Sequence, residues 1–399
     1  MKQQLKILMI CHESKVASIT REYPLARQLV QRGHEVTLLV VSLTERTGCS
    51  EFEWDGIRTV ETPSLLGGRL HRGWDPWNAL NRILFLSRDQ ETYDLVHCFE
   101  TRPSTIYPAL YYTRQHKRPL VTDWIDWWGR KGLIEVNRPW WYRILFGWVE
   151  TYYEEAFRSR AAGLTVISTG LIQRAIKLGV RPELICHITG GSLPDLFQAH
   201  TIEECRKRVG FPLSEPILGF SSINSHLDME IVFDSLAIVA RKYPSIKLIV
   251  TGKPKDSVRK LARKIGVEDH IYFVGALTSE DLPWYLGCAN VFLLPFPDKP
   301  YNIGRWPNKM NDYLYLGRPT VSNPVGDIKI LFEKHSVGCL AEWDPDDFAE
   351  KIVFLLENPQ ICAELGQNAI DVAKTDHNWE NLAIKLENFY FKILEMERK

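Results

Sequence analysis

The amino-acid sequence predicts an α/β fold made of two doubly wound units, each with a parallel sheet covered by helices. Short apolar runs alternate with helical patterns along the chain, which is typical of parallel strands joined by crossover helices. This series of runs begins again near residue 216. The length of 399 residues exceeds the size at which one core keeps growing, so two domains are expected.

The first predicted domain covers residues 1–198. Its buried strands are expected at residues 5–11, 34–42, 94–99, 119–124 and 164–168, with a first helix around 20–32. The second domain covers residues 199–379, with strands expected at 216–220, 246–252, 271–275, 291–295 and 319–323. The last helix, residues 380–399, has an apolar stripe made of Leu382, Ile384, Leu386, Phe389, Ile393 and Leu394.

Composition and charge exclude some classes of protein. Lysine plus arginine and aspartate plus glutamate each total 49, so the balanced charge predicts no affinity for nucleic acid. The eight cysteines are scattered without a C-x-x-C pair, which favours a reduced, cytoplasmic setting. The first apolar run is too short for a signal segment and is interpreted as a buried strand. Neither unit carries the G-x-G-x-x-G turn of a dinucleotide dehydrogenase.

A helix is predicted from Pro307 to Leu316, and Lys309 lies in its first turn. A cation there opposes the helix dipole unless an anion is bound beside it. A phosphate at this end would receive both the Lys309 ammonium and free backbone N–H groups. Asp312 shares the helix face and could accept hydrogen bonds from the vicinal hydroxyls of a sugar. The alternative is a solvated surface lysine with an ordinary acidic partner.

The stretch "PNKMNDYLYLGRPTVSNPVGD", residues 307–327, resembles the C-terminal signature of the GT-B glycosyltransferases, specifically the large retaining family four. The surrounding segments agree in order: "RGHEV" at 32–36, "YDLVH" at 93–97, "ICHITGGSLPDLF" at 185–197 and "IYFVGALTSEDLPWYLGCANVFLLP" at 271–295. The resemblance implies two Rossmann-like domains facing a cleft, with a nucleotide-sugar donor held mainly by the C-terminal domain. It also implies that the last helix crosses back to the N-terminal domain.

The resemblance assigns donor-binding roles residue by residue. Asp312 matches the second acid of the family's E-x7-E motif, which is similar to a ribose-binding carboxylate, whereas Gly304 stands where the first acid would be. Asn302 and Arg305 are the nearby substitutes for contacts with the donor sugar, and Asn308 belongs to the same signature. At 219–230 the family's arginine and lysine are missing, and Ser222 and Asn224 are offered instead. Neutralising the diphosphate is therefore expected to fall on Lys309, Arg305 and Lys253.

The stretch "VTDWIDWWGRKG" at 121–132 follows a predicted strand. Asp123 and Asp126 could orient an acceptor, while the nearby tryptophans stack on the apolar face of a sugar; these are Trp124, Trp127 and Trp128. A capped loop with core tryptophans is the alternative. His97 is interpreted as a core histidine at a strand end in preference to a catalytic one.

A helix opened by Pro139 carries an apolar stripe of Trp141, Ile144, Leu145, Trp148 and Tyr152. We interpret this stripe as core, because most such stripes are. Its aromatic and basic composition makes peripheral contact of residues 138–157 with the inner face of a membrane the alternative.

The sequence thus predicts a cytoplasmic, retaining glycosyltransferase that uses a nucleoside-diphosphate sugar and needs neither cofactor nor metal. Asp123, Asp126, Arg305 and Lys309 are the predicted catalytic residues. The acceptor is expected to be a carbohydrate, a lipid-linked compound or a small molecule. The alternatives are a nucleotide-sugar epimerase on the same fold and a non-catalytic partner subunit.

Overall fold

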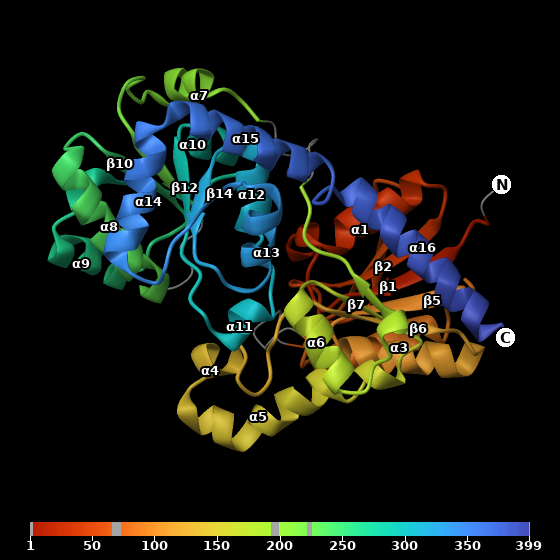
Figure 1. Ribbon diagram of the computed structural model, residues 1–399. Helices are drawn as coiled ribbons and strands as arrows, with labels where there is room; N and C mark the ends of the chain where they lie inside the picture. The colour runs from red at the N-terminus through yellow and green to blue at the C-terminus, as the bar shows by residue number, and fades with distance from the viewer. Residues whose placement is uncertain (1–2, 66–72, 193–198, 222–225, 399) are drawn as a thin grey trace. The chain divides into compact units, whose positions relative to one another are not determined.

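The computed structural model describes residues 3–65, 73–192, 199–221 and 226–398. Two compact units are present (Figure 1). The first comprises residues 1–190, 303–306 and 379–399, and the second comprises residues 191–302 and 307–378. The sequence set the change of domain at 198–199, whereas the first unit of the structure ends at Gly190 and also includes the short segment 303–306.

The first unit is built on an eight-stranded sheet with the order β3-β4-β2-β1-β5-β6-β7-β8. All neighbouring strands are parallel except β3 and β4. The strands are β1 (Lys6–Ile10), β2 (Glu35–Val41), β3 (Ser50–Trp54), β4 (Ile57–Thr62), β5 (Leu95–Phe99), β6 (Leu120–Trp124), β7 (Gly163–Val166) and β8 (Ile185–His187). Strands β1, β2, β5, β6 and β7 are those that the apolar runs predicted, whereas the parallel strands β4 and β8 were not predicted.

The helices of the first unit include α16, which comes from the far end of the chain. They are α1 (Glu22–Gln31), α2 (Pro76–Leu86), α3 (Pro103–His116), α4 (Ile134–Asn137), α5 (Trp140–Glu155), α6 (Thr169–Lys177) and α16 (Trp379–Glu397). Helices α1 and α16 lie side by side on one face of the sheet, and α3 lies on the other (Figure 1). The Tyr390 hydroxyl of α16 lies 2.6 Å from Nδ1 of His97 in β5.

The second unit is built on a six-stranded parallel sheet with the order β11-β10-β9-β12-β13-β14. The strands are β9 (Ile217–Phe220), β10 (Lys247–Thr251), β11 (Ile271–Gly275), β12 (Val291–Leu294), β13 (Thr320–Ser322) and β14 (Gly338–Leu340). The predicted fold class, two doubly wound α/β units, is confirmed.

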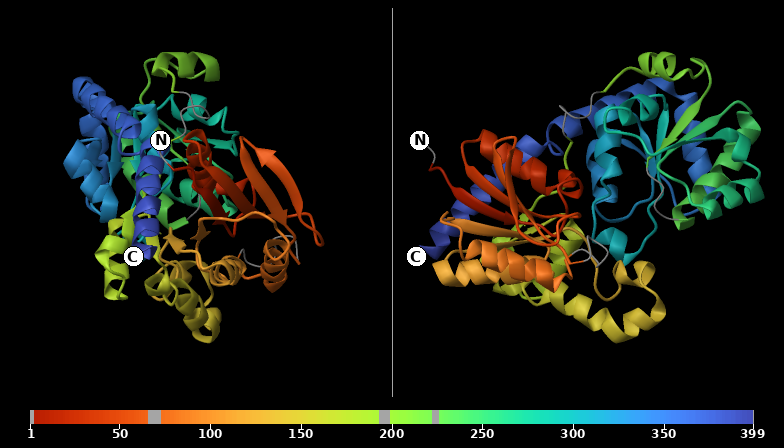
Figure 2. Two further views of the ribbon diagram at one scale, coloured as in Figure 1. Left: turned by 90° about the vertical axis from the view of Figure 1, so that its right-hand side faces the viewer. Right: turned by 180° about the vertical axis from the view of Figure 1, so that it is seen from behind.

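Helices cover both faces of this second sheet. They are α7 (Ile202–Val209), α8 (His226–Lys242), α9 (Asp256–Ile265), α10 (Leu282–Leu286), α11 (Pro300–Ile303), α12 (Lys309–Leu316), α13 (Gly326–His335), α14 (Pro345–Glu357) and α15 (Pro359–Lys374). Helices α8, α9 and α14 lie on one side of the sheet and α12 and α13 on the other (Figures 1 and 2). The main core lies between the sheet and the α8–α14 layer.

Candidate functional site

The strand order of the second sheet reverses between β9 and β12. In open α/β sheets, ligands bind outside the carboxyl ends of the strands at such a switch point. Strand β9 ends there at Phe220 and β12 ends at Leu294. Helix α12, which carries Lys309 and Asp312, is held directly at this position.

Tyr313 anchors α12 across the switch point. Its hydroxyl accepts a hydrogen bond from the backbone N–H of Ser221 (2.7 Å), just after β9, and donates one to the carbonyl of Leu293 (3.3 Å) in β12. The ring is fully buried and stacks on Phe292 with 4.1 Å between centroids. Sequence analysis missed this residue; the signal was an aromatic residue directly after Asp312, on the buried face of the helix.

Lys309 is the first residue of α12, and its ammonium lies 4.3 Å from the centroid of the Phe220 ring. The cation–π contact places this charge at the carboxyl end of β9. Burial raises the pKa of Asp312 to about 7, although Lys309 acts to lower it. The two residues that the sequence paired therefore share one partly buried site.

Fewer backbone N–H groups are free at the start of α12 than the sequence predicted. The N–H of Met310 donates to the carbonyl of Pro307 (2.8 Å), and the N–H of Asn311 donates to that of Asn308 (3.0 Å). These tight turns satisfy two of the first donors of the helix. Binding of an anion at this end would depend correspondingly more on the side chain of Lys309.

The remaining predicted donor residues differ in exposure. Lys253, which follows β10, is exposed, and so is Asn308. Asn302 is fully buried and its amide nitrogen donates to the carbonyl of Pro297 (2.7 Å), while its predicted contact with a sugar stays a prediction. Ser222 and Asn224 lie outside the described residues. Gly304 and Arg305 belong to the first unit.

Asp123, at the carboxyl end of β6, is fully buried. Its two oxygens accept hydrogen bonds from Nη2 and Nε of Arg21, both at 2.8 Å, and Thr165 donates a further one. Burial acts to raise the pKa of Asp123, but the Arg21 guanidinium lowers it below the ordinary value. The prediction that Asp123 orients an acceptor is therefore wrong, because its carboxylate is occupied inside the fold.

Asp126 is only partly buried, on the loop that follows β6. Burial raises its pKa to about 7, with Arg305 acting in the opposite direction. Glu100, which has a positive φ of 62°, accepts a hydrogen bond from the N–H of Ile125 (3.1 Å) and so fixes the start of this loop. Of the two aspartates that were predicted to orient the sugar acceptor, Asp126 is the one that is not fully buried.

The three tryptophans of this loop have different environments. Trp124 is fully buried, so the prediction that it stacks on a sugar is wrong. Trp127 and Trp128 are half-buried, with the Arg174 guanidinium 4.0 Å from a Trp127 ring centroid and that of Arg102 4.9 Å from Trp128. These two rings remain candidates for the acceptor.

Glu154 of α5 holds the loop in place and was missed from sequence. Its Oε1 accepts hydrogen bonds from the Trp124 indole N–H and the Trp128 backbone N–H, both at 3.0 Å, and from Arg174 at 3.3 Å. Its Oε2 accepts from the N–H of Gly129. An acid in an apolar helical stretch, 26 residues after Trp128, was the signal in the sequence.

His97 is a core residue, as interpreted from sequence. It is fully buried, and its Nε2 lies 3.0 Å from the Thr165 hydroxyl while its Nδ1 contacts Tyr390. Burial lowers the pKa of His97 to about 4. A neutral imidazole therefore links Thr165 and Tyr390 inside the core of the first unit.

The core interpretation of the α5 stripe is wrong. Ile144 is 70% exposed, Trp148 67%, Leu145 58%, Tyr152 50% and Trp141 48%. The opposite side of the helix faces inward, because Glu150 and Glu154 find their partners there; these acids are 3% and 5% exposed. The hydrogen bonds of the buried acids Glu150 and Glu154, and not the apolar stripe, determine which side of this helix faces inward.

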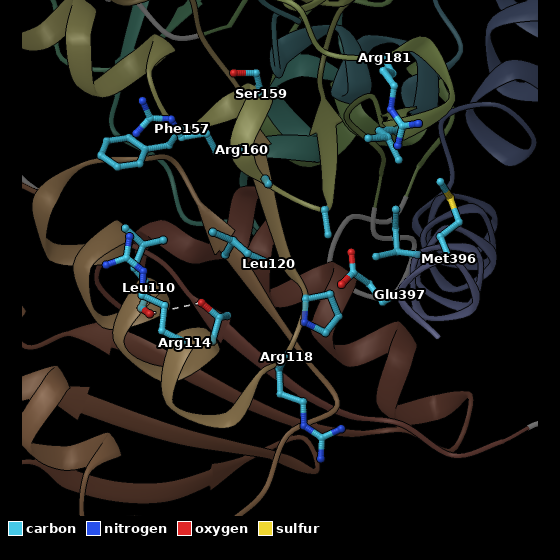
Figure 3. A pocket seen from close by; sticks show the side chains of 16 residues that line it. Leu110, Arg114, Arg118, Leu120, Phe157, Ser159, Arg160, Arg181, Met396 and Glu397 are labelled. Carbon is cyan, nitrogen blue, oxygen red and sulfur yellow. Dashed lines mark hydrogen bonds between the residues drawn. The ribbon is translucent and has the colours of Figure 1, made fainter. Parts of the chain in front are cut away.

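A pocket of about 630 Å³ lies at the amino ends of β6, β7 and β8, where Pro119, Ala162 and Leu184 line it (Figure 3). Figure 3 shows four arginines around its apolar lining: Arg114, Arg118, Arg160 and Arg181. The last residues of α3 and α16 lie nearby, and arginines stabilise the negative ends of helices. None of the predicted site residues lines this pocket.

No three histidine, cysteine, aspartate or glutamate side chains in the described part of the chain are grouped to hold a metal ion. Among the helices described, none is long and apolar enough to cross a bilayer.

Both units match known protein families. Residues 20–191 match the model of the glycosyl transferase 4-like domain, and residues 216–358 match that of the glycosyl transferases group 1. The mannosylfructose-phosphate synthase of Agrobacterium fabrum is 21% identical over 394 residues, which cover 91% of this chain and 83% of that protein.

Solved structures show the same fold. Sucrose-phosphate synthase from Thermosynechococcus elongatus superposes with a TM-score of 0.76 at 17% identity, over 99% of this chain and all of that one. Anabaena HepE in complex with UDP-glucose superposes with a TM-score of 0.70 at 17% identity, over 98% of this chain and all of that one.

Proposed function

Because this chain belongs to the GT-B glycosyltransferases of the family-four type, we propose that it transfers a sugar from a nucleoside-diphosphate sugar with retention of anomeric configuration. The observation that carries the proposal is Lys309, whose charge lies beside Phe220 at the switch point of the second sheet.

The donor is proposed to bind in the second unit. The Lys309 ammonium neutralises the diphosphate as a point charge, and Asp312 accepts hydrogen bonds from ribose hydroxyls. Anabaena HepE binds UDP-glucose on the same fold, which supports a nucleotide-sugar donor. Lys253 and Asn308 remain predicted donor contacts in this unit, and Gly304 and Arg305, which were also predicted as donor contacts, belong to the first unit.

The acceptor is proposed to bind at the loop that follows β6. Asp126 would orient the reacting hydroxyl, and Trp127 and Trp128 would contact the apolar face of a sugar. The acceptor class is a carbohydrate, a lipid-linked compound or a small molecule, and peripheral contact of residues 138–157 with a membrane is part of the proposal.

Retention follows from where the proton goes. An inverting enzyme needs a base on the face opposite the leaving group. In the proposed reaction the departing diphosphate oxygen takes the acceptor proton on the same face, while the glycosidic bond forms and the sugar–phosphate bond breaks. Lys309 stabilises the charge that grows on the leaving diphosphate, so the reaction is proposed to proceed without a metal.

Calorimetry with a panel of nucleoside-diphosphate sugars tests the donor site. Lys309→Ala should weaken binding of the donor by about 1.5–3 kcal/mol, because a hydrogen bond to a charged group is lost. Lys255→Ala, an exposed lysine at the start of α9, is the matched control and should bind as the wild type does. Wild-type affinity in Lys309→Ala would overturn the donor site.

Proton NMR of the reaction tests the chemistry. An α-linked donor should give an α-linked product, and activity should persist in EDTA. A β-linked product would overturn retention and direct attention to Asp126 as a base. A changed sugar still attached to its nucleotide would show an epimerase instead.

A further inference from the structure

One side of α5 forms an exposed aromatic and aliphatic surface, which we call the α5 face. It consists of Trp140, Trp141, Ile144, Leu145, Trp148 and Tyr152, all between 48% and 70% exposed. Helix α5 lies at the margin of the first unit in the different views (Figures 1 and 2). Contiguous apolar surfaces of this kind mark interaction sites in proteins.

The α5 face is held outward by the opposite side of the helix. Glu150 accepts hydrogen bonds from the Tyr142 hydroxyl (3.0 Å) and from Arg138 (3.3 Å). Glu154 accepts those of the loop after β6, and the Thr151 hydroxyl accepts one from the N–H of Arg130 (3.0 Å). Turning the face inward would break all of these bonds, so its exposure is built into the fold.

Basic residues outnumber acidic ones in the segment that leads into α5. Residues 130–149 contain four basic side chains, Arg130, Lys131, Arg138 and Arg143, and one acid, Glu135. Arg143 pairs with Glu135 at 2.6 Å, while the exposed Arg130 and Lys131 have no acidic partner among the residues that the structure describes. Any partner of this surface is therefore expected to carry negative charge.

We infer that the α5 face docks on the interface of a membrane that contains anionic lipids. Tryptophan and tyrosine favour the boundary between headgroups and acyl chains, because their rings are apolar and their N–H or O–H groups stay hydrated. Basic residues beside them are attracted to anionic headgroups. A single helix side of this composition fits a fluid interface, into which side chains insert without matching holes.

Docking also constrains the acceptor, and this step rests on the proposed function. The loop after β6, which carries Asp126, Trp127 and Trp128, is bound to the last turn of α5 through Glu154 and Thr151. The loop and the docked helix are thus one structural piece. An acceptor anchored in the same membrane is the substrate class that this arrangement serves, so we assign a lipid-linked acceptor.

Vesicle co-sedimentation of the full-length protein tests docking. The wild type should bind phosphatidylcholine vesicles with 30% phosphatidylglycerol, and Ile144→Ser with Trp148→Ser should lower the partition coefficient at least tenfold. Trp343→Ser is the matched control, since Trp343 is 45% exposed in the second unit, and it should bind as the wild type does. Circular dichroism should show all variants folded, because these side chains are exposed.

The double variant Arg130→Glu, Lys131→Glu tests whether the basic residues recognise anionic lipids. This variant should lose most of its preference for anionic over neutral vesicles, and salt should weaken wild-type binding. Equal binding of the wild type to both vesicle types would overturn the anionic lipid as partner. No binding to either, or a concentration-dependent dimer that Trp148→Ser abolishes, would overturn membrane docking.

A glycosylation assay with acceptors anchored in vesicles tests the lipid-linked acceptor separately from the proposed donor site. Lipid-linked acceptors in vesicles should be glycosylated at least tenfold more slowly by the Ile144→Ser, Trp148→Ser variant, while donor binding by calorimetry stays unchanged. Equal rates for the wild type and the variant would overturn the lipid-linked acceptor. If the wild-type protein bound no donor, the proposed function would be contradicted, whereas the inference that the α5 face docks on membranes would be unaffected.

Discussion

Helices α5 and α16 belong to the same unit and carry similar apolar stripes, but they lie in opposite orientations. In α16 the stripe is buried: Leu382, Leu386, Phe389 and Ile393 are at most 6% exposed. In α5 the corresponding residues are exposed, and Ile144, Trp148 and Tyr152 are at least 50% accessible. Apolar periodicity alone therefore identifies an amphipathic helix without saying what covers its apolar side.

The position of the buried carboxylates explains the difference. In α16, Glu387 is fully buried together with the apolar stripe and reaches Arg32 (3.1 Å) and His34 (3.0 Å). In α5, Glu150 and Glu154 lie four residues apart on the side opposite the stripe. When the two preferences conflict, α5 follows its acids, because buried donors without acceptors cost more than exposed apolar side chains.

The largest expected effect comes from removing one of these acids. Glu154→Ala should cost about 3–5 kcal/mol of unfolding free energy, because it leaves the backbone N–H groups of Trp128 and Gly129 without their acceptor and removes a buried partner of Arg174. Urea denaturation followed by tryptophan fluorescence reports on the first unit, since only Trp284 and Trp343 lie in the second. Glu155→Ala, which loses one half-buried pair with Arg174, should cost less than about 1 kcal/mol. Equal costs for the two would break the explanation given for α5.

Glu22, in α1, extends the comparison, because it is a buried acid with fewer hydrogen-bond donors around its carboxyl group than Glu154 or Glu387. It is 1% exposed, its Oε1 has no hydrogen-bond partner among the described residues, and burial raises its pKa from 4.5 to about 8. The folded state therefore keeps this proton to a higher pH than the unfolded state does. The stability it contributes is present below pH 4.5 and is lost as the pH rises through 8.

The measurement is the unfolding free energy of Glu22→Gln against the wild type at several pH values. Between pH 5 and 8.5 the difference should shift in favour of the glutamine variant by about 3–4 kcal/mol. A constant difference across this range would show that Glu22 ionises alike in both states.

The smallest expected effect belongs to the α5 face. Ile144→Ala should change the unfolding free energy by no more than about 0.5 kcal/mol, because the side chain is 70% exposed. Leu386→Ala, the matched position in α16, should cost about 2–5 kcal/mol, because it leaves a cavity. A cost above about 1.5 kcal/mol for Ile144→Ala would mean that another part of the protein covers the face in solution.

Much of the fold could be predicted from sequence, because most of the buried parallel strands are short apolar runs. The antiparallel pair β3 and β4 was missed, since residues 50–54 are mostly polar and exposed and residues 57–62 contain only two apolar side chains. Strand β14 was missed because three residues, Gly338–Leu340, carry too little pattern.

The candidate site was predictable only in part. The spacing of Lys309 and Asp312 correctly placed both on one helix, because that relation is local. The contacts of Tyr313 with Ser221 and of Glu154 with the loop after β6 join residues far apart in sequence, and no local pattern encodes them. The burial of Asp123, Trp124 and Asn302 likewise depends on what other segments place around them.

The return of α16 to the first unit has a consequence for synthesis on the ribosome. The first 190 residues emerge without the helix that supplies Tyr390 to His97 and Glu387 to Arg32 and His34. At 5–20 residues per second, the chain needs roughly 10–40 s more to reach residue 379. During that time the surface of α1 that α16 will cover stays open to water, so the nascent first unit completes its fold only after the second has been made.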